Sequence, residues 1–196
     1  MCIRDRRCNQ KLQIRRSLGL EGKKVLLFVG RFNKSKRIDF LLKAFSILYQ
    51  QDNSFHLMLV GSGEETYLKQ QHQNISSFGS ITDLDKLAPI YVAADIFAFP
   101  GLVGLGPLQA LCYNLPVITI SSKSHKPEIE YLSSLNSRVL DSKTTPKEYA
   151  SQIIELFKDG NQLSNLQNNT WDSIKHLTIE QMAKNFINGV NEILET

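Results

Sequence analysis

The chain has 196 residues, of which 42% are hydrophobic and 21% are charged. Both fractions are typical of a globular domain and exclude a disordered or fibrous chain. The longest apolar runs have the length of a strand, so no segment of the sequence is suited to cross a membrane. The net charge of +4 arises in the first 24 residues, and residues 25–196 carry 15 basic and 17 acidic residues. That balance excludes the basic stripe of a nucleic-acid-binding domain, and we expect no nucleic-acid partner.

Residues 1–23 are predicted to form a solvated basic lead-in to a domain that covers 24–196. No apolar segment follows the arginines, as a secretory signal would require. The opening residues, Met1 to Arg6, resemble a translated sequencing adapter. We therefore expect part of the lead-in to be an artefact and the natural protein to begin further upstream.

The three cysteines lack the spacing of a metal site, and their odd number favours a reducing compartment. We therefore expect a cytoplasmic protein without a metal centre. Cys112 lies in an apolar run and is predicted to be a small core residue. The single tryptophan, Trp171, is predicted to be a packing anchor.

From residue 24 the hydrophobic period alternates between that of a strand and that of a helix. In chain order the predicted elements are strand 24–30, helix 37–50, strand 55–60, helix 64–73, strand 76–79, helix 84–93, strand 96–100, helix 105–113, strand 116–120, helix 127–133, strand 138–140, and two or three closing helices, the last over 178–194. This alternation predicts an α/β domain with a Rossmann-like parallel sheet and helices on both faces. Ligands of such sheets bind beyond the carboxyl ends of the strands.

A basic turn follows the first predicted strand. Gly30 permits a tight turn, and Arg31 and Lys36 place positive charge where the next helix begins. Cations at a helix N-terminus are unfavourable unless an anion lies between them, and a diphosphate would be such an anion. We expect both cations to be exposed without a ligand. A solvated basic turn explains the same residues.

Glycines mark two further strand ends. Gly61 and Gly63 follow the second strand, and three glycines, at positions 101, 104 and 106, lie just before a helix. Such loops let backbone amides approach an anion or a sugar. Ordinary tight turns explain them as well.

The order of these motifs resembles a known family. Gly-Arg-x4-Lys at 30–36, Leu-Val-Gly-x-Gly at 59–63, Phe-Gly-x-Ile at 78–81, Ala-Asp-Ile-Phe-x-x-Pro at 94–100 and Gly-Leu-x3-Gln-Ala-Leu-x3-Leu-Pro-Val-Ile at 104–118 occur in sequence. Together they resemble the C-terminal donor-binding domain of family-4 retaining glycosyltransferases of the GT-B fold, over roughly residues 24–194. No single motif among them is decisive.

The resemblance implies transfer of a sugar from a nucleotide-diphosphate donor to a glycan or lipid-linked acceptor, without a metal or other cofactor. Arg31 and Lys36 match the family's diphosphate-binding pair, the backbone near Ile81 matches the region that meets the base, and Gly104 and Leu105 lie beside the diphosphate and sugar. The donor-binding positions implied are Gly30, Arg31, Lys36, Gly61, Ile81, Gly104, Leu105, Gln109 and Glu128.

The sequence departs from the family at two positions. The family commonly carries two glutamates eight positions apart, and here these positions hold Gly101 and Gln109. Gln109 retains hydrogen-bonding capacity toward ribose, whereas Gly101 offers no side chain. A bacterial surface-polysaccharide subgroup resembles this variant and carries a His-x-Pro-Glu element, present here at 125–128. In that subgroup Glu128 would contact the sugar, although an acid that stabilises a helix N-terminus would look the same. No catalytic residue is assigned.

Three functions remain open at this point: a glycosyltransferase donor domain, a catalytically silent domain of the same fold that acts as an assembly partner, and an epimerase-like enzyme acting on a nucleotide sugar. The loss of both glutamates favours the second, and the presence of Arg31 and Lys36 favours the first. The resemblance implies that the acceptor binds an N-terminal domain absent from the chain, and that the full enzyme associates peripherally with the inner face of the membrane. The chain alone is therefore expected to be inactive. Its last helix is expected to expose an apolar stripe that reaches the missing domain.

Overall fold

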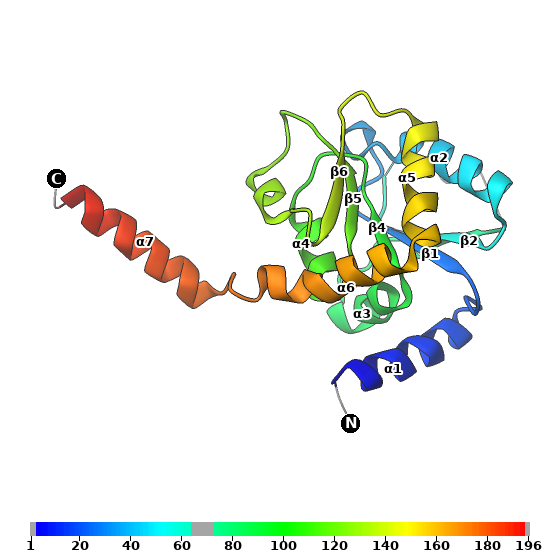
Figure 1. Cartoon of the computed structure of the whole chain (residues 1–196), viewed down its shortest axis with the longest axis horizontal. Helices are drawn as coiled ribbons and strands as arrows, with labels where there is room; N and C mark the ends of the chain where they lie inside the picture. Colours follow the sequence, from blue (N-terminus) through cyan, green and yellow to red (C-terminus); the bar gives the residue numbers. More distant parts are fainter. Residues whose placement is uncertain (1–2, 64–72, 195–196) are drawn as a thin grey trace.

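The computed structural model describes residues 3–63 and 73–194, and its core is a six-stranded parallel sheet (Figure 1). The strands are β1 (Lys24–Val29), β2 (Phe55–Val60), β3 (Ile75–Ser77), β4 (Ile96–Ala98), β5 (Val117–Ile120) and β6 (Ser137–Leu140). Every pair of neighbouring strands is parallel. The predicted α/β fold with a Rossmann-like sheet is confirmed.

Seven α-helices are described. They are α1 (Ile3–Ser17), α2 (Ile38–Gln51), α3 (Leu84–Ala93), α4 (Leu105–Cys112), α5 (Pro146–Lys158), α6 (Gly160–Ile174) and α7 (Ile179–Leu194). Two 3-10 turns matter for the site, η1 (Lys34–Lys36) and η3 (Pro127–Tyr131). The helix predicted over 64–73 lies almost entirely outside the described residues, and the one predicted over 127–133 is the 3-10 turn η3.

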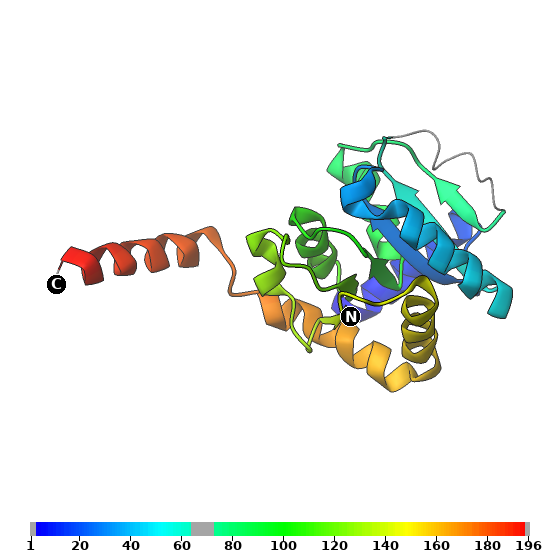
Figure 2. The same ribbon diagram turned by 90° about the horizontal axis from the view of Figure 1, so that it is seen from above.

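The order of strands in the sheet is β3-β2-β1-β4-β5-β6. The chain therefore builds outward in one direction from β1 to β3, then crosses back and builds outward in the other direction from β4. The boundary between β1 and β4 is the switch point at which open α/β sheets bind their ligands. Helices α2 and α5 pack together on one face, whereas α1 and α3 pack together on the other. Figure 2 shows the same layers from above.

The sheet is buried because its central strands are apolar on both faces. All six residues of β2 are buried, as are the four inner residues of β1. On the face covered by α3, a continuous aromatic stack runs through Tyr113, Tyr91, Phe97, Phe99 and Phe28, with neighbouring ring centroids 4.9 to 6.1 Å apart. This stack forms an apolar floor beneath the carboxyl ends of β1 and β4.

The basic lead-in differs from its prediction. Residues 3–17 form helix α1, and two of its cations bind Asp95 at the start of β4: Lys11 Nζ lies 2.9 Å from Oδ1 and Arg15 lies 2.6 Å from Oδ2. Asp95 also accepts the backbone N–H of Val25 at 2.9 Å. Because the Asp95 carboxylate is only 14% exposed, these two cations pair with a largely buried charge and hold α1 against the domain. The lead-in is therefore not simply a solvated segment.

Two side chains predicted to be packed, Cys112 in the core and Trp171 as an anchor, are exposed. Cys112 lies on the outer side of the last turn of α4, and Trp171 in α6 is 50% exposed. The buried face of α6 instead holds Leu166, Thr170 and Ile174. Apolar character alone misassigned both residues, because each lies on the solvent side of its helix.

Helix α7 projects away from the domain (Figure 1). None of its described residues is buried, and Ile179, Phe186 and Ile193 are each more than 70% exposed. The predicted apolar stripe is thus confirmed as exposed. Among the helices of the described segments, none has the length and apolar character to span a membrane.

Candidate functional site

The switch point of the sheet brings two predicted motifs into contact. The turn after β1 and the glycine loop after β4 (residues 100–104) are joined by a hydrogen bond from the Leu102 N–H to the Ser35 carbonyl at 2.9 Å. The Lys36 ammonium closes the contact by donating to the Leu102 carbonyl oxygen at 2.7 Å. The two motifs therefore form one surface.

Steric contact explains why position 101 holds glycine. A Cβ added to Gly101 would overlap the backbone of Lys36, because the turn passes directly against the loop. No side chain fits there without moving the turn. The absence of a glutamate at this position is thus tied to the geometry that places Lys36.

Lys36 is half-buried, so the expectation that it would be exposed without a ligand was wrong. Its ammonium lies 5.2 Å from the centroid of the Phe99 ring, at the end of the aromatic stack. Burial lowers the pKa of this ammonium, the nearby Glu128 carboxylate opposes that shift, and Lys126 adds to it. A cation on an apolar floor interacts strongly with an approaching anion because little water screens it. Arg31, by contrast, is exposed as predicted.

The loop after β5 completes this surface. His125 accepts the Val103 N–H at its Nδ1 atom (3.0 Å), and its Nε2 atom lies 2.9 Å from the Ile120 carbonyl oxygen. Three residues later Glu128 is the second residue of the turn η3, and its Oε2 atom is buried without a hydrogen-bond partner in the described residues. Polar atoms in such a position need a partner, and a ligand hydroxyl can be one.

The turns after β2 and β3 lie on the other side of β1. The Phe32 N–H donates to the Ser62 carbonyl and the Gly61 N–H to the Gly79 carbonyl, at 2.9 and 2.7 Å. Gly61 has a φ of +141°, and a Cβ there would overlap the Gly30 carbonyl, so the close approach of the two turns requires glycine. Ile81 follows the turn after β3 and packs partly against the core. Gly30, Arg31, Gly61 and Ile81 thus follow neighbouring strand ends at one edge of the sheet.

Gln109 lies in α4 and is half-buried. Its side-chain oxygen accepts the Tyr91 hydroxyl at 3.3 Å, and burial raises the pKa of that hydroxyl, so it remains a donor. In the described part of the chain its amide NH₂ group makes no hydrogen bond. At the start of the same helix, Gly104 is the N-cap and offers no side-chain cap, while Leu105 is exposed. The first amides of α4 are accordingly not capped by the preceding side chain.

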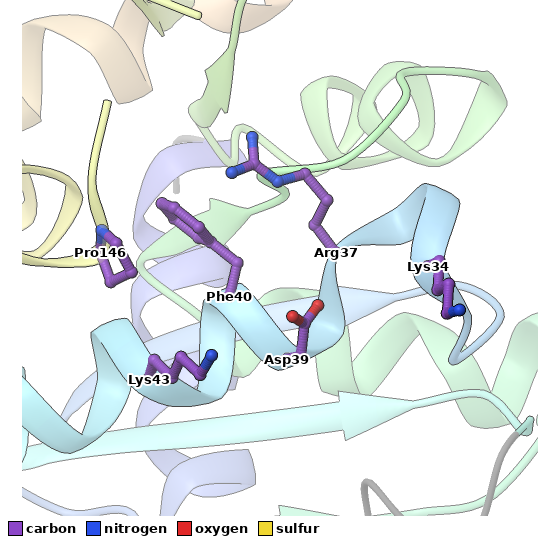
Figure 3. A pocket seen from close by; sticks show the side chains of 6 residues that line it. All are labelled: Lys34, Arg37, Asp39, Phe40, Lys43 and Pro146. Carbon is purple, nitrogen blue, oxygen red and sulfur yellow. The ribbon is translucent and has the colours of Figure 1, made fainter. Parts of the chain in front are cut away.

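The other two cations of the turn, Lys34 and Arg37, line a different pocket. An open pocket of about 350 Å³ between the starts of α2 and α5 is lined by Lys34, Arg37, Asp39, Phe40, Lys43 and Pro146 (Figure 3). The Arg37 guanidinium lies 4.3 Å from the centroid of the Phe40 ring. Arg31 and Lys36 are therefore the two cations of the turn that do not line this pocket.

Sequence reasoning selected the turn, the glycine loop and Glu128 as candidates, but it assigned no role to His125 or to the Ser35–Leu102 contact. Only the His-x-Pro-Glu spacing indicated that His125 lies near the site. Within residues 3–63 and 73–194, no group of three or more His, Cys, Asp or Glu residues has the arrangement of a metal site.

A doubly wound sheet with a cationic turn and a glycine loop at its switch point defines an α/β domain of the class that binds nucleotides. The chain belongs to a particular family of this class, because the family model described as glycosyl transferases group 1 matches residues 23–159. The resemblance to a glycosyltransferase that the motifs predicted is thus confirmed.

Individual proteins are similar to the chain in sequence or in fold. An uncharacterized glycosyltransferase of Methanocaldococcus jannaschii is 29% identical over 124 residues, which are 57% of this chain and 31% of that protein. A crystal structure of Anabaena HepE in complex with UDP and glucose superposes with a TM-score of 0.73 at 16% identity, over 93% of this chain and 52% of that one. The C-terminal domain of LpcC, a glycosyl transferase group 1 protein of Francisella tularensis, has a TM-score of 0.70 at 20% identity, over 84% of this chain and 91% of that domain. The chain thus spans about a third of the curated relative and about half of HepE.

Proposed function

We propose that the chain is the donor-binding domain of a retaining glycosyltransferase that moves a sugar from a nucleotide diphosphate to a glycan or lipid-linked acceptor. The observation that carries this proposal is the joined surface at the switch point. There the Lys36 ammonium holds the glycine loop through its bond to Leu102, and Arg31 lies exposed on the same turn after β1.

The diphosphate would bind between the turn and the start of α4. Arg31 is an exposed guanidinium that can form paired hydrogen bonds to phosphate oxygens, and Lys36 supplies a point charge over the Phe99 ring. The amides at the start of α4, next to Gly104, have no side-chain cap. As the bond to the sugar breaks, negative charge grows on the leaving diphosphate, and these groups are placed to stabilise it. They would do so without a metal ion.

The sugar and the nucleoside would lie on either side of the diphosphate. Glu128 carries a buried oxygen without a hydrogen-bond partner in the described residues, and it lies close enough to Lys36 to affect that side chain's pKa. We infer that this oxygen accepts a sugar hydroxyl. Gln109 has an amide NH₂ group directed to no partner in the described residues and would bond the ribose, while the base would lie against the backbone near Ile81.

The acceptor would bind a second domain upstream of the chain. Exposed Ile179, Met182 and Phe186 on α7 form an apolar stripe suited to contact that domain. The polar side of α7 carries Glu180, Glu192 and a single cation, Lys184. That composition does not favour an anionic lipid surface, which attracts helices rich in lysine and arginine. Any peripheral membrane association of the full enzyme would therefore depend on another part of it.

Calorimetric titration of the chain with UDP, GDP and ADP, and with the glucose conjugates of each, tests the proposal. Arg31→Ala should weaken binding by about 1.5–3 kcal/mol, the contribution of a charged hydrogen bond. Lys34→Ala is the matched control, because Lys34 lines the separate pocket of Figure 3 and should leave affinity unchanged. Absence of binding by the unaltered chain, or equal affinity of the Arg31 variant, would contradict the proposed site.

A further inference from the structure

His125 uses both of its ring nitrogens within the protein. Its Nδ1 atom is 3.0 Å from the backbone nitrogen of Val103, which can only donate, so Nδ1 accepts and carries no proton. Its Nε2 atom is 2.9 Å from the Ile120 carbonyl oxygen, which can only accept, so Nε2 carries the proton. The backbone around His125 therefore selects one tautomer of the neutral ring.

The residue that His125 holds is at the centre of the glycine loop. Val103 is fully buried, and its carbonyl oxygen also accepts the Lys126 N–H at 3.2 Å. On one side of Val103, Leu102 is bound to the turn through Ser35 and Lys36. On the other side, Gly104 is the N-cap of α4. The loop is thus fixed from two directions, by the turn after β1 and by His125 after β5.

We propose that His125 is a positioning residue, which in its neutral Nε2–H form holds the glycine loop in the shape that binds the donor and which releases the loop when the ring is protonated. The inference rests on the proposed function, since it concerns the loop that would face the diphosphate and sugar. Protonation would place an N–H at Nδ1 against the N–H of Val103, so two donors would oppose each other where one bond existed.

The charges around the loop do not relieve this conflict. Lys36 approaches from the turn after β1 and Lys126 is the next residue in the chain, so two cations lie near the loop. Lys123 lies on the same segment and is exposed. Glu128 on η3 is the nearby acid, and Lys36 already interacts with it. Acidification would therefore add a positive charge to a site that already holds two cations.

Three variants separate the two bonds of the ring. In His125→Asn the side-chain oxygen can occupy the place of Nδ1 and accept from Val103. In His125→Gln the longer amide can reach the Ile120 carbonyl but not Val103. His125→Ala removes both bonds. If the bond to Val103 positions the loop, the Asn variant should resemble the unaltered chain, whereas the Gln and Ala variants should not.

UDP-glucose is the probe of choice, because its diphosphate has no terminal phosphate that titrates near pH 6. The Gln and Ala variants should bind it about 5- to 30-fold more weakly, the effect of one to two kcal/mol, while the Asn variant stays within about 3-fold. Nitrogen NMR of the unaltered chain should show Nε2–H. The fall of affinity with acidification should follow the ring's own titration in the same sample, and the Asn variant should lack that fall.

Three results would each overturn the inference: unaltered affinity for UDP-glucose in His125→Gln, an Nδ1–H tautomer of the ring, or an affinity whose pH dependence does not follow the protonation of the ring. In those cases the unaltered chain still binds UDP-glucose, and the proposed function stands. If the unaltered chain binds none of the nucleotides tested, the proposed function fails, and the inference fails with it. Denaturant midpoints of all three variants show whether the fold is intact, and the comparison of Asn with Gln holds even if His125→Ala unfolds.

Discussion

Adding one methyl group at position 101 should damage the domain although the position lies in a loop. In Gly101→Ala the new Cβ would overlap the backbone of Lys36, and backbone atoms cannot rotate away as a side chain would. The turn and the loop must separate, which strains the Leu102–Ser35 and Lys36–Leu102 hydrogen bonds. Overpacking costs about 1–3 kcal/mol, and weakening these bonds adds about 1 kcal/mol. We expect a total loss of about 2–4 kcal/mol in the free energy of unfolding.

Gly104→Ala is the matched control for stability, because a Cβ there meets no atom within 4 Å. Its φ of −157° lies outside the left-handed region that favours glycine. Both variants restrict the unfolded chain equally. Because Gly104→Ala also places a less favourable residue at the N-cap of α4, the difference between the two unfolding free energies is a lower bound on the cost of the overlap. Urea unfolding followed by circular dichroism measures that difference. Equal stability of the two variants would refute the steric reasoning.

Three further outcomes follow from the structure. Asp95→Asn should lower the free energy of unfolding by about 2–3 kcal/mol, since it leaves two half-buried cations of α1 without their charge partner. The control Glu21→Gln breaks an exposed ion pair and should lower the free energy of unfolding by less than about 1 kcal/mol. Denaturant midpoints compare the two variants. Burial, and to a smaller degree Lys23, lowers the pKa of His56 to about 4. The unfolded chain therefore binds the proton first, and stability should fall as the pH drops from about 6.5 toward 4; His56→Gln should flatten that slope, and an unchanged slope would contradict it. Finally, the chain alone should transfer no sugar, because no acceptor wall orients the attack or excludes water; activity should appear when the upstream coding region is restored, and turnover by the chain alone would contradict the two-domain proposal.

The sequence predicted the sheet well because its strands are short apolar runs with turns at their ends. The runs 24–30 and 55–60 appear as β1 and β2 within a residue at each end. It could not predict the packing of α1, because the partner of Lys11 and Arg15 is Asp95, some eighty residues away. A helix with a weak apolar face is predicted to be solvated when its charge partner, Asp95, is not considered.

Within the site, residue type was predictable and environment was not. Arg31 is exposed as its charge suggests, but Lys36 lies over the Phe99 ring because the aromatic stack continues to the sheet edge. The steric need for glycine at position 101 depends on a contact with the backbone of Lys36, which no local pattern encodes. These features arise when separate loops meet, and they therefore required the structure.

The position of Asp95 also determines an order of events during synthesis. Its side chain joins residues 11, 15 and 25, at sequence separations of 84, 80 and 70. Strand β1 can pair with β2 after about thirty residues of further chain, but helix α1 has no anchor until α3 and Asp95 have emerged from the ribosome. Contacts between such distant residues close late, because the loop between them must first be ordered. Until Asp95 has emerged, the growing domain therefore carries a basic helix that is not yet docked, and docking of α1 marks the completion of its central strands.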